Sequence, residues 1–163
     1  MSLLLSRSPL LAALVLGLAG TAALAADVPP SGAKPLSQIL EAAHKVQPGV
    51  IVSAEFDDGR WEVVSCNAEG RGCREIHLDP RTAKVLRNRR ESSFDAPPPA
   101  GSQTAAQIAS AFEGRQLGAI SEIEFDDPVW EVTVGSGTSR AKFDVDPASG
   151  EVQRCRGLGC PKR

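Results

Sequence analysis

The chain has 163 residues and a formal net charge of −2, from 18 lysines and arginines against 20 aspartates and glutamates. A chain of this length forms one domain or two very small ones. Its charge lacks the strong positive field that nucleic-acid and anionic-membrane binding require, so we expect neither of these among its partners.

Residues 1–25 have the pattern of a cleavable signal peptide. Arg7 supplies a sparse positive start, residues 10–18 are an apolar run, and Ala23-Leu24-Ala25 fits a signal-peptidase site. The apolar run is too short for a membrane-spanning helix, and no cysteine lies directly after the cut to carry a lipid anchor. We therefore expect cleavage after Ala25 and a mature protein that is periplasmic or secreted and does not span the membrane.

A nine-residue segment occurs twice, as EFDDGRWEV at residues 55–63 and as EFDDPVWEV at residues 124–132. With a constant offset of 69, the match extends without a gap from residues 36–65 to residues 105–134. An internal repeat of this length indicates one folding unit copied in tandem. We place the first unit at residues 34–90, a linker rich in proline and glycine at 91–103, the second unit at 104–156 and a basic tail at 157–163.

Each unit is predicted to begin with a short amphipathic helix. Apolar side chains recur at the i, i+3, i+4 and i+7 spacing of one buried helix face. They are Leu36, Ile39, Leu40, Ala43 and Val46 in the first unit, and Ala105, Ile108, Ala109 and Phe112 in the second. Ser102 or Thr104 is expected to be the N-cap of the second helix.

Short strands with a period of two follow each helix. The inward side chains are Ala54, Phe56, Trp61, Val63, Ile76 and Leu78 in the first unit, and Ile123, Phe125, Trp130, Val132, Phe143 and Val145 in the second. The glutamates between them point to the opposite face, and the tryptophans are expected in the core rather than on a partner surface. The fold class that follows is α+β, with two tandem units, each a short helix packed on an antiparallel sheet of three to four strands. Whether the two units share one sheet stays open.

The succession of a helix, a glycine, E-F-D-D, W-E-V and then V-D-P-x-x-G-E-V resembles the PepSY domain family. The last motif occurs as DVDPASGEV at residues 144–152 and, more weakly, as HLDPRTAKV at residues 77–85. PepSY domains occur in exported bacterial proteins and in the propeptides of thermolysin-type metallopeptidases, and they act by binding, commonly as inhibitors or regulators of peptidase activity. The resemblance therefore implies a non-enzymatic binding or regulatory protein of the cell envelope. It implies an envelope or secreted protein, such as a peptidase, as the partner.

All four cysteines lie in the part of the chain that is expected to be exported. An even number of cysteines in an oxidising compartment indicates disulfides, and the spacing favours the local pairs Cys66–Cys73 and Cys155–Cys160. The alternative is a metal site at CRGLGC. The C-x₂-C spacing of zinc sites is absent, however, and no histidine is near in sequence. We therefore expect two disulfides and no cofactor.

Two acidic turns are candidate binding sites. Asp57 and Asp58 end the first repeated strand, and Asp126 and Asp127 end the second. Together with Glu55 and Glu124, these residues offer hard oxygen ligands to a cation such as calcium, or a charged contact to a partner. The other interpretation is a polar turn between two strands, because such turns demand aspartate followed by glycine or proline. The acidic turns define the alternative function, a periplasmic protein that binds a metal or a small ligand.

Catalytic machinery is not expected. The two histidines, His44 and His77, do not belong to a recognisable nucleophile motif, and the sequence has no glycine-rich phosphate loop. The basic stretches at residues 87–90 and 154–163 have two interpretations, a solvated edge strand or a docking patch for an acidic partner.

Overall fold

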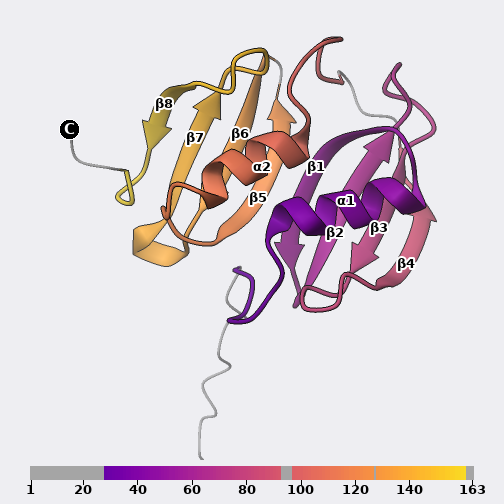
Figure 1. Ribbon diagram of the computed structural model, residues 1–163, viewed down its shortest axis with the longest axis horizontal. Helices are drawn as coiled ribbons and strands as arrows, with labels where there is room; N and C mark the ends of the chain where they lie inside the picture. Colours follow the sequence, from indigo (N-terminus) through magenta and orange to yellow (C-terminus); the bar gives the residue numbers. More distant parts are fainter. Residues whose placement is uncertain (1–27, 93–96, 127, 161–163) are drawn as a thin grey trace, which may run out of the picture.

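The structure is a computed structural model that describes residues 28–92, 97–126 and 128–160. The predicted signal peptide and Asp127 lie outside these residues. The elements, in chain order, are α1 (Leu36–Val46), β1 (Val50–Asp57), β2 (Arg60–Cys66), β3 (Arg74–Leu78), β4 (Val85–Arg90), α2 (Ala105–Glu113), β5 (Ile120–Asp126), β6 (Val129–Val134), a short 3₁₀ turn (Gly137–Ser139), β7 (Ala141–Val145) and β8 (Val152–Arg156) (Figure 1). Among the described residues, no helix is long and apolar enough to cross a membrane.

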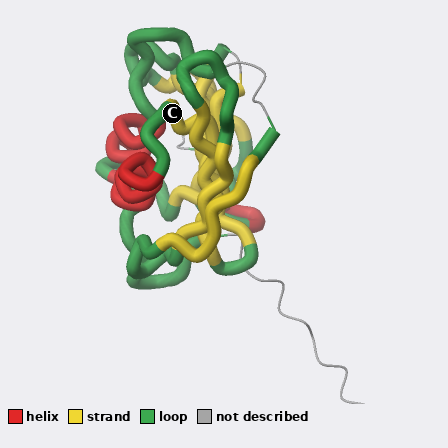
Figure 2. Tube along the Cα trace, turned by 90° about the vertical axis from the view of Figure 1, so that its right-hand side faces the viewer, coloured by secondary structure: helices red, strands yellow, loops and turns green. Residues whose placement is uncertain are grey.

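The eight strands form one antiparallel sheet in the order β4-β3-β2-β1-β5-β6-β7-β8. Both α-helices lie on the same side of this sheet, as the edge-on view in Figure 2 shows. The molecule therefore has two layers, one of helices and one of strands. We call the opposite side of the sheet the open face, because no described α-helix covers it.

The two units meet where β1 pairs with β5, its equivalent in the repeat. Ser53 lies opposite Glu124, Ala54 opposite Ile123 and Glu55 opposite Glu122. The α+β class is confirmed, but the two units do not form separate sheets of three to four strands. In separate units β1 and β5 would both be edge strands with unpaired backbone groups. Their pairing supplies hydrogen-bond partners to the edge of each unit that faces the other.

The helices follow the predicted apolar spacing and end up against the sheet. Leu36, Ile39, Leu40 and Ala43 of α1 are buried, as are Ala105, Ile108, Ala109 and Phe112 of α2. Val46, which was predicted to share the buried face, is 43% exposed because it lies at the end of the helix. Thr104 is the N-cap of α2 and forms a capping box with Gln107.

The aromatic side chains of the repeated segment form the centre of each half of the core. Trp61 is 1% exposed and Trp130 is fully buried, as the alternation predicted. Phe56 packs edge-to-face on Trp61 with ring centroids 5.5 Å apart, and Phe125 packs in the same way on Trp130 at 5.4 Å. Such a pair contributes about 0.5–1.5 kcal/mol beyond the burial of its area. One cluster of buried side chains spans both units, so the halves share a core.

Two disulfides close local loops, with the pairing expected from the spacing. Cys66 at the end of β2 is bonded to Cys73, which directly precedes β3, and both are buried. Cys155 on β8 is bonded to Cys160. In the chain-entropy account, loops this short stabilise the folded state by about 2–3 kcal/mol each.

Candidate functional site

The open face carries the side chains that alternate with the core residues of the strands. At its centre, Glu55 on β1 lies directly opposite Glu62 on β2 and Glu122 on β5. Two residues further along β5, Glu124 lies opposite Glu131 on β6. We call these five residues the central glutamates. They span the four middle strands and cross the junction between the two units.

Some of the central glutamates are neutralised by basic side chains from neighbouring positions. Arg60 pairs with Glu62 at 2.6 Å, and Arg140 pairs with Glu122 at 3.3 Å. Glu131 is held by Lys142 and by Arg156, the latter at 2.5 Å. Arg60 lies on β2 beside Glu62, and the other partners come from β7, from β8 and from the residue before β7, so basic side chains surround this acidic centre.

Glu55 and Glu124 are different, because they form no ion pair within the described part of the chain. They occupy the same position in the two units. Partial burial raises the pKa of the Glu55 carboxyl, and the nearby Glu122 raises it further. Burial and the same Glu122 also raise the pKa of Glu124. Like charges directly opposite one another destabilise a sheet, so this arrangement has an energetic cost, which Arg140 near Glu55 and Lys142 near Glu124 offset only in part.

A second group on the open face has the composition of a metal site. Glu62, Glu75 and His77 place one ligand atom each within 4.8 Å of one another. His77 Nε2 contacts Glu75 and lies 3.8 Å from Glu62 Oε1. His77 is only 6% exposed, so its imidazole is part of a half-buried polar network rather than a solvated edge.

This group is already balanced by arginines. Arg89 donates two hydrogen bonds to the Glu75 carboxylate, at 2.8 and 2.6 Å, and these bonds are the main cause that lowers the pKa of Glu75 to about 2. A divalent cation would have to compete with this guanidinium and with Arg60 on Glu62. In the second unit, Lys142 occupies the position of Glu75 and Asp144 that of His77, so the ligand set occurs in one unit only.

The predicted acidic turns are not brought together. Asp57 ends β1 and Asp126 ends β5, and these neighbouring strands run antiparallel, so the two turns lie at opposite ends of the sheet (Figure 1). Asp58 has a positive φ of 46° in a tight turn with Gly59, and its carboxylate lies 3.8 Å from Arg60. A shared site from Asp57, Asp58 and Asp126 is therefore excluded by the topology, and binding at either single turn stays a prediction.

Sequence reasoning missed the central glutamates as a group. It placed Glu55, Glu62, Glu124 and Glu131 on the outward face, but it gave Glu122 no role. The signal was the alternation of glutamate with aromatic residues in both repeats. That signal becomes a site only when β1 and β5 are known to be neighbours, and the periodicity of the sequence does not contain this information.

Comparison with known proteins gives two family matches. A family model described as "Peptidase propeptide and YPEB domain" matches residues 9–89, and a second model with the same description matches residues 101–156. No curated protein matches the chain significantly. Among solved structures, a candidate lipoprotein from Clostridium difficile 630 is similar, with 17% identity, a TM-score of 0.47, and coverage of 78% of this chain and 95% of that one.

Proposed function

The chain belongs to the PepSY family, and from this premise we propose that it is an exported, non-catalytic protein that binds a peptidase and modulates its activity. The family description as a peptidase propeptide domain supports the class of partner. The open face supports the mode of action, because eight strands form one continuous sheet and no described α-helix covers this side of it (Figure 2).

The observation that carries the proposal is the pair Glu55 and Glu124. Each charge lies among other carboxylates, and neither glutamate forms an ion pair with a described basic side chain. Arg140 acts on Glu55 and Lys142 on Glu124 in the opposite direction, but burial and Glu122 have the larger effect on both pKa values. A basic surface on a partner would relieve this repulsion, and charge complementarity of this kind sets the orientation and the rate of association. The central glutamates therefore fit a partner that presents lysine or arginine side chains.

The histidine of this face is engaged with neighbouring charged groups rather than arranged as part of a catalytic set. His77, the histidine of the open face, contacts Glu75, and Glu75 is held by Arg89. A general base needs an accessible proton acceptor within reach of a nucleophile or a bound water. An imidazole that is buried between carboxylates supports a structural role instead.

A binding assay with matched variants tests the proposal. The mature chain, starting at Ala26, is titrated against a secreted thermolysin-type metallopeptidase while peptide hydrolysis is followed. We expect a concentration-dependent change in activity, which weakens by roughly tenfold in the double variant Glu55→Gln/Glu124→Gln and also weakens with added salt. Glu69→Gln, in the exposed loop between β2 and β3, is the control and should leave the titration unchanged. An equal response of the double variant and the wild type would reject the open face as the binding surface.

A second candidate function is the binding of a divalent cation, favoured by the geometry of Glu62, Glu75 and His77. Zinc and calcium titrations followed by melting temperature separate the possible sites. A rise that is lost in His77→Gln would assign the metal to this group, and a rise lost in Asp57→Asn would assign it to the first acidic turn. Unchanged melting temperatures with both ions would reject the second candidate.

A further inference from the structure

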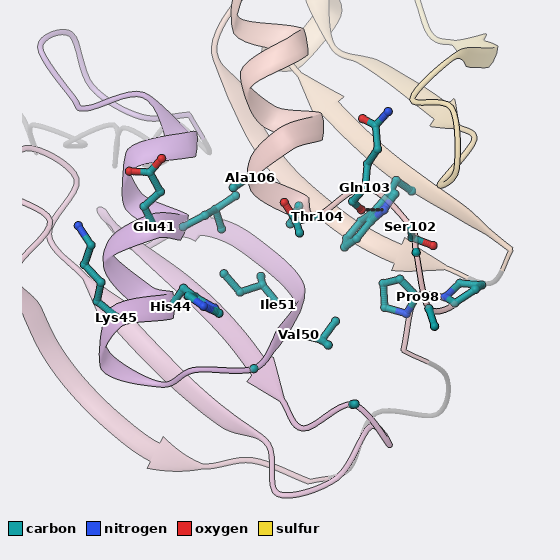
Figure 3. Close-up of a pocket in the computed structure, with 18 residues that line it drawn as sticks. Glu41, His44, Lys45, Val50, Ile51, Pro98, Ser102, Gln103, Thr104 and Ala106 are labelled. Carbon is teal, nitrogen blue, oxygen red and sulfur yellow. Dashed lines mark hydrogen bonds between the residues drawn. The ribbon is translucent and has the colours of Figure 1, made fainter.

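A pocket of about 470 Å³ lies on the helix side of the molecule, at the junction of the two units. Its walls include Leu40 and His44 of α1, Ile51 of β1, Ala105 of α2 and Trp130 of β6. Figure 3 shows side chains of α1 on one side of the pocket and the segment leading into α2, with Gln103 and Thr104, on the other. We call it the helix-junction pocket. Its volume lies within the range of about 300–1,000 Å³ that is typical of ligand sites.

The repeat contains a second copy of this pocket. A smaller cavity of about 290 Å³ is lined by Leu36, Glu113, Ile120 and Trp61. These residues are 69 positions away from Ala105, His44, Ile51 and Trp130, respectively. The two cavities are therefore equivalent places in the two units, and the residues that differ between them explain the difference in size.

Two substitutions close the smaller cavity and leave the larger one open. The Ser37 backbone N–H and hydroxyl donate to the Glu113 carboxylate, at 3.0 and 2.7 Å, and this contact joins the two helices at Glu113, which lines the cavity. Ala106 and His44 occupy the equivalent positions in the larger pocket, and alanine has no hydroxyl to form such a bond. Ala105 in place of Leu36 widens the pocket further.

The indole N–H of Trp130 in the helix-junction pocket does not need a polar ligand atom as a hydrogen-bond partner. The indole N–H of Trp130 already donates to the backbone carbonyl of Gln103 at 3.2 Å. At the rim, Glu41 and Lys45 lie one helical turn apart on α1, and neither forms an ion pair with a described residue. Their formal charges balance, and the exposed imidazole of His44 between them can form a hydrogen bond with a neutral polar group, so the rim suits a neutral hydrogen-bonding group.

We propose that the helix-junction pocket binds an uncharged apolar side chain of leucine or phenylalanine size, presented by a polypeptide. An apolar interior below a polar mouth matches an apolar side chain attached to a neutral, hydrogen-bonding peptide backbone. Apolar anchors that fill such pockets often dominate protein–protein binding. The pocket goes beyond the function proposed above, because it lies on the helix side and the central glutamates lie on the open face.

The two tryptophans provide one reporter for each cavity. Trp130 lines the helix-junction pocket and Trp61 lines the smaller cavity, and they are the two tryptophans of the chain. The indole N–H signals are followed by NMR during titration with N-acetyl-leucinamide and N-acetyl-phenylalaninamide. N-acetylglycinamide controls for the backbone, and octanoate tests a charged, lipid-like ligand. We expect a saturable shift of the Trp130 signal in the millimolar range with the first two probes, and an unchanged Trp61 signal.

Reciprocal variants exchange the residues that differ. His44→Glu/Ala106→Ser places the closing pair in the helix-junction pocket and should weaken the Trp130 response by roughly tenfold or more. Ser37→Ala/Glu113→His removes the closing pair from the smaller cavity, and the Trp61 signal should then respond as well. Circular dichroism and the indole signal of the unmodified cavity report whether each variant is folded. The variant Glu55→Gln/Glu124→Gln should leave both responses unchanged, so that a failure here is distinct from a failure of the proposed function.

Three results would overturn the proposal. The first is a Trp130 signal that does not respond to either apolar amide in the wild type. The second is tighter binding of octanoate than of the amides, which would assign the pocket to an anionic apolar ligand. The third is an unchanged response in folded His44→Glu/Ala106→Ser, which would place the bound probe elsewhere.

Discussion

At the scale of single residues, the side chains of the repeated segment lie on two opposite faces of the same strands. Phe56 and Trp61 pack in the core, while Glu55 and Glu62 between and beside them lie on the open face. The alternation of side chains along a strand imposes this division. The charge on the open face is therefore a separate property from the stability of the core, and each can be changed without the other.

Glu55→Gln is predicted to stabilise the protein at neutral pH. The amide removes a charge that faces Glu62 and Glu122, and relief of like-charge pairs across strands is worth roughly 0.2–1 kcal/mol. Because the folded-state pKa of Glu55 is raised above 4.5, the repulsion is fully present above that raised pKa and disappears as the pH falls toward 4.5. Urea unfolding at several pH values should show a benefit that shrinks with acidification. A loss of stability at neutral pH would contradict the prediction, and Glu69→Gln is the matched control.

Glu75→Gln is predicted to have the opposite effect. It weakens two hydrogen bonds from Arg89 to a buried carboxylate, and bonds to charged groups contribute about 1.5–3 kcal/mol. The folded-state pKa is about 2, below the ordinary 4.5, so the stabilisation is complete above pH 4.5 and is lost as the pH falls toward 2. The difference in unfolding free energy between variant and wild type should shrink over that interval. A difference that stays constant with pH would show that the carboxylate charge is not its source.

At the scale of elements, the contact between α1 and α2 is asymmetric. α2 is capped by its own Thr104 and Gln107. The N-cap of α1 is Pro35, which has no side-chain acceptor, and Glu113 at the end of α2 accepts the hydrogen bonds of Ser37 instead. A carboxylate at a helix N-terminus is also favoured by the helix dipole. One unit therefore caps the helix of the other.

Glu113→Ala is predicted to destabilise the protein by roughly 1–3 kcal/mol, because it removes the two hydrogen bonds to a charged acceptor that cap α1. His44→Ala, at the equivalent position of the first unit, should change stability by less than about 0.5 kcal/mol. Chemical denaturation followed by circular dichroism measures both. Equal effects of the two variants would show that the inter-unit cap does not contribute.

Most single elements could be predicted from the sequence, whereas their assembly could not. The apolar face of each helix and the alternation of side chains along each strand depend on local periodicity, which is visible in the sequence. The pairing of Ala54 with Ile123 at the junction depends on contacts between residues 69 positions apart, and two linked separate sheets would have had the same local pattern. Because the sequence does not show that β1 pairs with β5, the central glutamates were not recognised as a group, and the acidic turns were interpreted as the sites.

At the scale of the whole molecule, the shared core and the β1–β5 pairing make the two units one structural body. Side chains of both units belong to a single buried cluster, and the sheet is continuous across the junction. Two units that bury each other in this way lose stability together when either one opens. The duplication has therefore produced one domain with a continuous open face.

We accordingly predict one cooperative unfolding transition. In Trp61→Phe the fluorescence reports on the second half through Trp130, and in Trp130→Phe it reports on the first half through Trp61. In each variant the fluorescence midpoint should coincide with the midpoint from circular dichroism. Midpoints that separate consistently in either variant would show that the halves unfold independently.

The central claim is that the open face binds a peptidase through Glu55 and Glu124. The most direct measurement is the activity of a secreted thermolysin-type metallopeptidase across a micromolar titration with the wild-type chain from Ala26 onward and with Glu55→Gln/Glu124→Gln. We expect the wild type to change the activity in a saturable manner and the double variant to require roughly tenfold more protein for the same effect. Unchanged peptidase activity at high micromolar wild-type protein would contradict the account.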